Sequence, residues 1–71
     1  MATYELVFYN ADEEERYQGT RFELEPIFDR ISKGMDVSNF KVQIPWDTMK
    51  LVQIDKRSDG RTKATYKRVF K

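Results

Sequence analysis

The chain has 71 residues, a net charge of +1, and neither cysteine nor histidine. Disulfide bonds and metal sites built on cysteine or histidine, which reinforce many domains of this size, are therefore excluded. The same absence removes the commonest general base and the thiol nucleophile of enzymes. We expect a protein that is not an enzyme and has no catalytic, cofactor-binding or metal-binding residues.

Length and hydropathy limit how the chain can be organised. Either half of it would be too short to bury a core, so residues 1–71 are expected to form a single small globular domain. The longest purely apolar or aromatic run, Leu6 to Tyr9, is far shorter than the ~20 residues of a membrane-spanning helix. Because no secretory leader opens the sequence and cysteine is absent, we predict a cytoplasmic protein without a membrane partner.

The first 24 residues predict two strands on either side of a polar segment. In residues 3–9 the even positions hold large apolar side chains, which is the period-two pattern of a half-buried strand. Residues 10–18 are polar on all sides and are interpreted as either a short solvated helix or a loop. Residues 20–24 alternate again, which suggests a second short strand.

A helix is predicted over residues 26–33. Pro26 suits the first helical position, and Gly34 suits the residue after the last one. The apolar residues follow the i, i+3, i+4, i+7 spacing of one helix face, which here comprises Leu24, Ile27, Phe28 and Ile31. The opposite face is charged and is expected to lie in solvent.

Residues 40–46 show the clearest alternation in the chain. One parity is entirely apolar and comprises Phe40, Val42, Ile44 and Trp46. This pattern predicts a strand with one buried face. Because Pro45 has no N–H to donate to a neighbouring strand, we expect this strand to lie at an edge of the sheet or to end there.

The last third of the chain predicts a β-hairpin. One strand begins at Val52, and the other covers residues 62–70. A three-residue loop, Ser58-Asp59-Gly60 with Gly60 left-handed, gives the pairs Asp55–Lys63, Ile54–Ala64 and Val52–Tyr66. A two-residue turn would instead place Lys67 opposite Val52 and bury lysines among apolar side chains, so we prefer the longer loop.

Together these elements predict an α+β fold. We expect an antiparallel sheet of four to five strands with one packed helix, in the order β-β-α-β-β-β, and an extra short polar helix at residues 10–18 as the alternative to a loop. The predicted core comprises Tyr4, Leu6, Phe8, Phe22, Leu24, Ile27, Phe28, Ile31, Phe40, Val42, Ile44, Trp46, Val52, Ile54 and Tyr66.

Charge is distributed unevenly along the chain. Residues 1–36 hold nine acids and four bases, whereas residues 56–71 hold seven bases and one acid. In the preferred register, the outward side of the hairpin carries a stripe of cations comprising Arg57, Arg61, Lys63, Lys67 and Lys71. Such a stripe can neutralise phosphates, meet an acidic protein surface, or keep a sheet face soluble.

Three large residues are further candidates for partner contact: Trp46, Leu51 and Tyr17. Leu51 is predicted to point outward from the hairpin, and Trp46 stands at the end of its strand. Large, partly exposed side chains of this kind carry most of the energy of protein interfaces. The outward side of the hairpin offers no aromatic platform for stacking bases, which disfavours base-specific binding of single strands.

A chain without a catalytic set is expected to act by contact. The leading hypothesis is a stand-alone protein-binding module that regulates or inhibits a partner protein by occluding its surface, a format common among phage-type accessory inhibitors. The first alternative is a nucleic-acid-binding protein that uses the basic C-terminal hairpin. The second is a homo-oligomeric structural protein in which the acidic N-terminal part of one subunit meets the basic hairpin of another.

Overall fold

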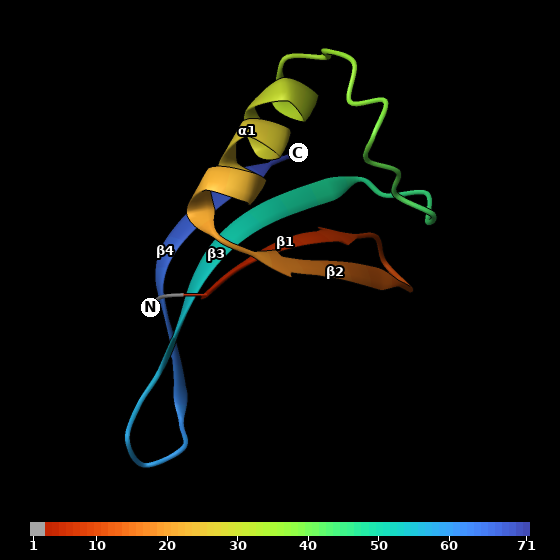
Figure 1. Cartoon of the computed structure of the whole chain (residues 1–71). Helices are drawn as coiled ribbons and strands as arrows, with labels where there is room; N and C mark the ends of the chain where they lie inside the picture. The colour runs from red at the N-terminus through yellow and green to blue at the C-terminus, as the bar shows by residue number, and fades with distance from the viewer. Residues whose placement is uncertain (1–2) are drawn as a thin grey trace.

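The fold is one antiparallel sheet with a single helix packed across one of its faces. The computed structural model describes residues 3–71, with the side chain of Tyr66 outside the described part. Its elements are β1 (Thr3–Tyr9), β2 (Glu14–Gly19), α1 (Arg21–Ser32), β3 (Thr48–Lys56) and β4 (Thr62–Phe70). The strands lie in the order β2-β1-β3-β4, and α1 crosses above them (Figure 1). The predicted α+β class, an antiparallel sheet of four to five strands with one packed helix, is confirmed, and the observed order β-β-α-β-β has one strand fewer after the helix than predicted.

The first hairpin corrects the interpretation of residues 10–18. This segment contains strand β2, so both the predicted polar helix and the predicted loop are wrong for residues 14–18. The Asn10 side-chain oxygen accepts hydrogen bonds from the backbone N–H groups of Asp12 and Glu13, each at 2.8 Å, and so closes the turn. The segment is so polar because β2 is an edge strand, whose outer side faces water.

The helix begins at Arg21, five residues before the predicted start, so the predicted strand at residues 20–24 is wrong. Thr20 and Glu23 form a variant of the capping box in which both hydrogen bonds involve the Thr20 hydroxyl. The Thr20 hydroxyl accepts a hydrogen bond from the Glu23 N–H at 3.3 Å and donates to the Glu23 carboxylate at 3.1 Å. Pro26 consequently lies inside the helix and not at its first position. At the other end, Gly34 has a φ of 73° and follows the last turn, as predicted.

The core lies between α1 and the sheet face that it covers. Its buried residues are Tyr4, Leu6, Phe8, Leu24, Phe28, Met49 and Leu51. Strand β3 thus turns Leu51 inward, where it stands opposite Leu6, and the predicted outward position of Leu51 is wrong. Because β3 is apolar on both sides, its own alternation does not identify the buried face. The pairing of β3 with β1 identifies it. This pairing places Val52 and Ile54 on the face away from the helix, so their predicted place in the helix-side core is wrong.

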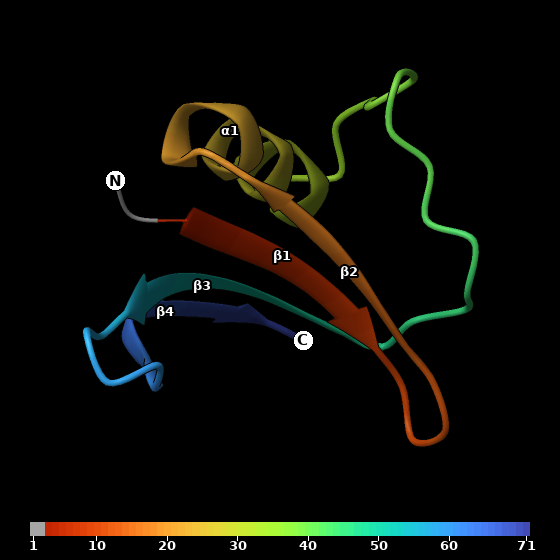
Figure 2. The same ribbon diagram turned by 60° about the horizontal axis from the view of Figure 1, so that its bottom comes forward.

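Residues 33–47 form a long extended connection from α1 to β3. The predicted strand at residues 40–46 is absent, although the predicted alternation of burial is present: even positions are half-buried and odd positions exposed. Phe40, Val42 and Trp46 pack against the core, and Phe40 meets Tyr17 of β2 with a ring distance of 4.6 Å. Figure 2 shows this connection beside the helix, on the same side of the sheet. The segment serves as cover for the sheet and not as part of it.

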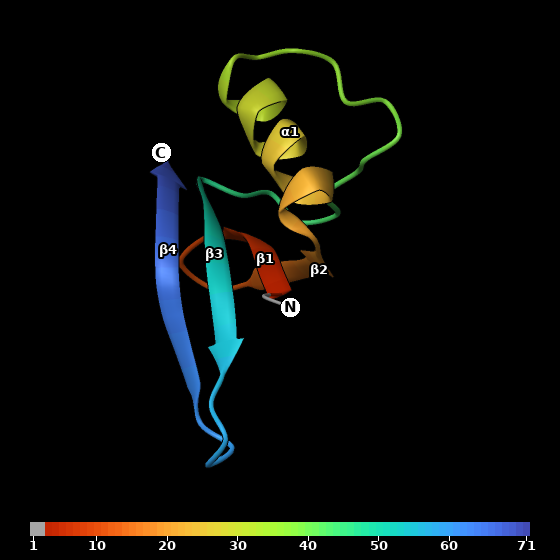
Figure 3. The ribbon, with the colours of Figure 1, turned by 60° about the vertical axis from the view of Figure 1, so that its left-hand side comes forward.

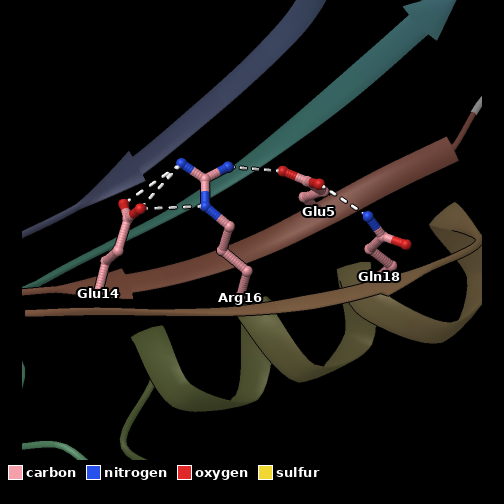
Figure 4. A network of polar contacts seen from close by, with 4 residues as sticks. All are labelled: Glu5, Glu14, Arg16 and Gln18. Carbon is pink, nitrogen blue, oxygen red and sulfur yellow. Dashed lines mark hydrogen bonds and ion pairs between the residues drawn. The ribbon is translucent and has the colours of Figure 1, made fainter.

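The face away from α1, here called the open face, contains Val7, which is only 1% exposed. Arg16 stands opposite Val7 on β2. Its guanidinium pairs with Glu5 at 2.9 Å and with Glu14 at 3.3 Å, and Gln18 donates to the other oxygen of Glu5 at 3.0 Å (Figure 4). This network fixes the long Arg16 side chain across the cross-strand position of Val7, so its aliphatic part can shield the valine from water.

The second hairpin, β3–β4, combines the two predicted registers: the one with a three-residue loop near the turn and the one with a two-residue turn farther along the strands. Near the turn the three-residue prediction is confirmed: Gly60 has a φ of 85°, and Asp55 faces Lys63. A bulge at Thr65 then shifts the pairing, so Lys67 and not Tyr66 faces Val52. This part of the prediction is wrong. The shift turns Arg68 and Phe70 toward the helix, where the Arg68 guanidinium lies 4.5 Å from the centre of the Phe28 ring and pairs with Asp29 at 2.8 Å.

Truncation of Leu51 tests the corrected orientation of β3. Leu51→Ala is expected to lower the free energy of unfolding by ~2–5 kcal/mol, because it removes buried methyl groups and leaves a cavity. Typical stabilities for a chain of this length are only ~4–10 kcal/mol. The matched control Val69→Ala, at a half-exposed position on the open face, should cost less than about 0.5 kcal/mol. Equal shifts of the urea midpoint for the two variants would show that the orientation of β3 is wrong.

Candidate binding surfaces

The structure does not present Leu51, Trp46 and Tyr17 as one exposed group. Leu51 is completely buried. Trp46 and Tyr17 are half-buried, and both hold the 33–47 connection against the sheet. The Trp46 ring lies 5.2 Å from the Phe8 ring, and the Tyr17 ring lies 4.6 Å from the Phe40 ring. These contacts assign Trp46 and Tyr17 a packing role.

Glu15 connects β2 to the same connection. Its carboxylate accepts hydrogen bonds from the Tyr17 hydroxyl at 2.7 Å and from the backbone N–H of Gln43 at 2.9 Å. The Tyr17 bond, followed by the backbone N–H groups of Gln43 and Ile44, lowers the pKa of Glu15 despite partial burial. Burial, together with the neighbouring Glu15 charge, raises the pKa of Tyr17 to about 12. This arrangement is a structural clip between β2 and the connection.

A pH titration of Tyr17 tests this clip. Since the folded pKa of Tyr17 is raised, its contribution to stability should be complete below pH ~10 and lost as the pH rises through about 12. In the ultraviolet absorbance of tyrosinate, one tyrosine is expected to titrate near 12 in the native protein. That step should disappear in Tyr17→Phe and persist in the control Tyr9→Phe. A native protein in which every tyrosine titrates near ~10 would contradict the clip.

The five predicted cations do not form one stripe. Arg57, Arg61 and Lys63 lie at the tip of the β3–β4 hairpin. The bulge at Thr65 places Lys67 on the open face, opposite Val52, whereas Lys63 shares the helix-side face with Asp55. Lys71 follows the end of β4, at the opposite end of the sheet from the hairpin tip (Figure 1).

The hairpin tip projects beyond the rest of the molecule. Within residues 3–71, the last pair between β1 and β3 joins Thr3 to Ile54, and residues 55–63 have no neighbouring strand except each other. Figure 3 shows this segment, here called the arm, extending below the sheet. Every residue from 56 to 63 is exposed.

The carboxylates of the arm are already hydrogen-bonded within the β3–β4 hairpin. Asp55 accepts hydrogen bonds from the Thr65 hydroxyl at 2.9 Å and from the Gln53 side chain at 3.3 Å. Asp59 accepts from the Arg61 N–H at 3.0 Å and lies 3.9 Å from the Arg61 guanidinium. Within the described residues, no ion pair is found for Lys56, Arg57 or Lys63. The arm therefore presents positive charge to solvent.

A second surface centres on Phe22, which is 91% exposed although it lies on a helix with a buried face. Beside it, a hollow of about 340 Å³ lies between α1 and residues 36–40. Pro26, one turn after Phe22, is also exposed and borders the same hollow. We call this region the Phe22 surface.

Sequence reasoning placed Phe22 in the core, which is wrong, yet a signal for its true position exists. The pattern Thr20-x-x-Glu23 marks the start of a helix. In a helix that starts there, Phe22 lies two residues before Leu24 and so points away from the stripe that Leu24 shares with Phe28.

No family model, no curated protein and no solved structure matches the chain, so its function has to be inferred from its own residues. In the part of the chain that the structure describes, no helix is long and apolar enough to cross a membrane. Within the same residues, no three His, Cys, Asp or Glu side chains form a group that could hold a metal ion, and this includes the acidic turn after β1.

Proposed function

We propose that this protein is a binding module that occludes a surface of a partner protein, and that the Phe22 surface makes the contact. The observation that supports this proposal is the 91% exposure of Phe22 beside a hollow of about 340 Å³. Full burial of a phenylalanine side chain contributes ~1.5–3 kcal/mol, and in the free protein this energy is not used. Rigid aromatic side chains next to pockets are typical centres of binding energy in protein interfaces.

The Phe22 surface is preorganised. The capping box fixes the first turn of α1, so Phe22 is held on an ordered helix and not on a mobile loop. Pro26 has no N–H, and the carbonyl of Phe22 therefore lacks the donor that residue i+4 normally supplies. This carbonyl can accept a hydrogen bond from a partner that covers the phenyl ring. Preorganisation lowers the entropy lost on binding.

The lining of the hollow indicates the chemistry of the occupant. Its lining includes the half-buried apolar side chains of Ile27, Val37 and Phe40 and, at its exposed rim, the charged residues Glu23, Asp36 and Arg30. Because two carboxylates and one guanidinium stand at this rim, the partner is expected to insert an apolar side chain that has a lysine or arginine beside it. We further propose that the protein acts in the cytoplasm as a regulator or inhibitor, in the format of the small phage-type accessory inhibitors.

Position-specific photo-crosslinking tests this function. Benzoyl-phenylalanine is placed at position 22 in one variant and at position 69 in another, since Val69 is 50% exposed on the open face. In a lysate of the source cells, only the variant labelled at position 22 should form a discrete adduct with one protein. An excess of unlabelled native protein or Val69→Ser should suppress the adduct, and Phe22→Ser should not.

Three results would contradict the proposal. These are equal adducts from both positions, no adduct from position 22, and suppression of the adduct by Phe22→Ser. An adduct with twice the mass of the chain would favour the homo-oligomer hypothesis instead. Because Phe22 is exposed, its substitution should leave the urea midpoint unchanged, and this control separates lost binding from lost folding.

A further inference from the structure

The length of the arm is not explained by packing in the fold. Residues 56–63 are all exposed, and in the part of the chain that the structure describes, β1 pairs with β3 only as far as Thr3 opposite Ile54. A hairpin that projects in this way adds little to the stability of the fold, because it contributes no apolar contacts to the core. We therefore look for the role of its charged residues in the binding of a partner molecule.

Cations surround the arm instead of lining one side. Lys63 shares a face with Asp55, whereas Lys56 pairs with Thr62 and lies on the other face. Arg57 and Arg61 flank the turn, where the Arg57 N–H donates to the Arg61 carbonyl at 2.7 Å. A flat acidic protein surface could meet only one of these faces, but a groove with anions along both walls meets all four cations at once.

We propose that the arm binds double-stranded nucleic acid by entering a groove between the two phosphate backbones. The major groove of B-form DNA is about 12 Å wide and admits a two-stranded β-ribbon. Lys56, Arg57, Arg61 and Lys63 then contact phosphates on both walls. This activity goes beyond the protein-binding function proposed above and uses a different surface.

The composition of the arm favours duplex over single strands. Residues 55–63 contain no aromatic side chain on which unpaired bases could stack. They also contain no Asn or Gln for bidentate recognition of adenine. Affinity is therefore expected to come mainly from phosphate contacts and to depend strongly on salt.

The acidic residues of the protein do not oppose this contact. Asp12 to Glu15 lie at the β1–β2 turn and the start of β2, at the opposite end of the sheet from the arm (Figures 1 and 2). At physiological ionic strength, charges separated by more than about 8 Å in solvent are largely screened from each other. At lower ionic strength, the acidic residues at one end and the cations of the arm at the other orient the molecule with the arm toward the polyanion.

Fluorescence anisotropy with a labelled DNA duplex of mixed sequence tests the inference. The triple variant Arg57→Gln, Arg61→Gln, Lys63→Gln is compared with a control of equal net charge, Lys33→Gln, Lys41→Gln, Lys71→Gln, whose three positions are exposed. The arm variant should reduce the slope of log K against log salt by roughly 2.7. The native protein then loses roughly 40-fold more affinity than the arm variant between about 50 and 200 mM salt. The control should keep the native slope, and so should Phe22→Ser.

Several results would overturn the inference. They are an absence of duplex binding by the native protein at low salt, equal losses in the arm variant and the control, and tighter binding of a single strand than of the duplex. If polyglutamate binds as tightly as the duplex, the partner of the arm is an acidic protein and not a nucleic acid. The urea midpoint of the arm variant is measured in parallel and should match that of the native protein, since the three side chains are exposed.

Discussion

The fold depends on one constraint: a single helix is too narrow to cover a four-stranded sheet. The 12 residues of α1 make a cylinder about 18 Å long and ~10 Å wide, whereas the outer strands of four lie about 14 Å apart before their side chains are counted. The helix therefore covers the centre of the sheet, and the side toward β2 needs another layer. The 33–47 connection provides that layer with Phe40, Val42 and Trp46, and the clip formed by Glu15 and Tyr17 holds it there.

The same constraint determines which groups remain available for partners. The inward stripe of α1 is already occupied by Leu24 and Phe28, so Phe22 has no place in the core and lies on the outer side with Pro26. At the other end, β3 and β4 continue beyond Thr3 of β1, and no layer formed by the described residues covers their extension. The two surfaces thus differ in chemistry: the Phe22 surface is apolar with an acidic rim, and the arm is polar and cationic.

Much of the fold could be predicted from the sequence, but pairing and faces could not. Strand β1, the end of α1 and the left-handed Gly60 follow from short-range patterns. The start of α1 was missed because Thr20, Phe22 and Leu24 alternate like a strand over five residues, although the capping box indicates a helix. Alternation in residues 40–46 correctly reports one-sided burial, yet it carries no information on whether the backbone pairs with a strand. Of the cations of the arm, Arg57, Arg61 and Lys63 were predicted and Lys56 was not. The bulge that separates Lys63 from Lys67 could not be predicted, because the turn and the packing of Arg68 and Phe70 on the helix side set different registers.

Amide hydrogen exchange at Gln43 and Ile44 tests most directly whether the connection serves as the second part of the covering layer. The Gln43 N–H donates to the Glu15 carboxylate at 2.9 Å, and the Ile44 N–H lies near enough to contribute to the lowered pKa of Glu15, so both should be protected in the native protein even though no strand includes them. In Glu15→Ala these two amides should exchange as fast as unstructured peptide, while the amides of Leu6 and Leu51 in the sheet remain protected. Rapid exchange of Gln43 and Ile44 in the native protein would contradict this arrangement, because the side of the sheet toward β2 would then lack its cover.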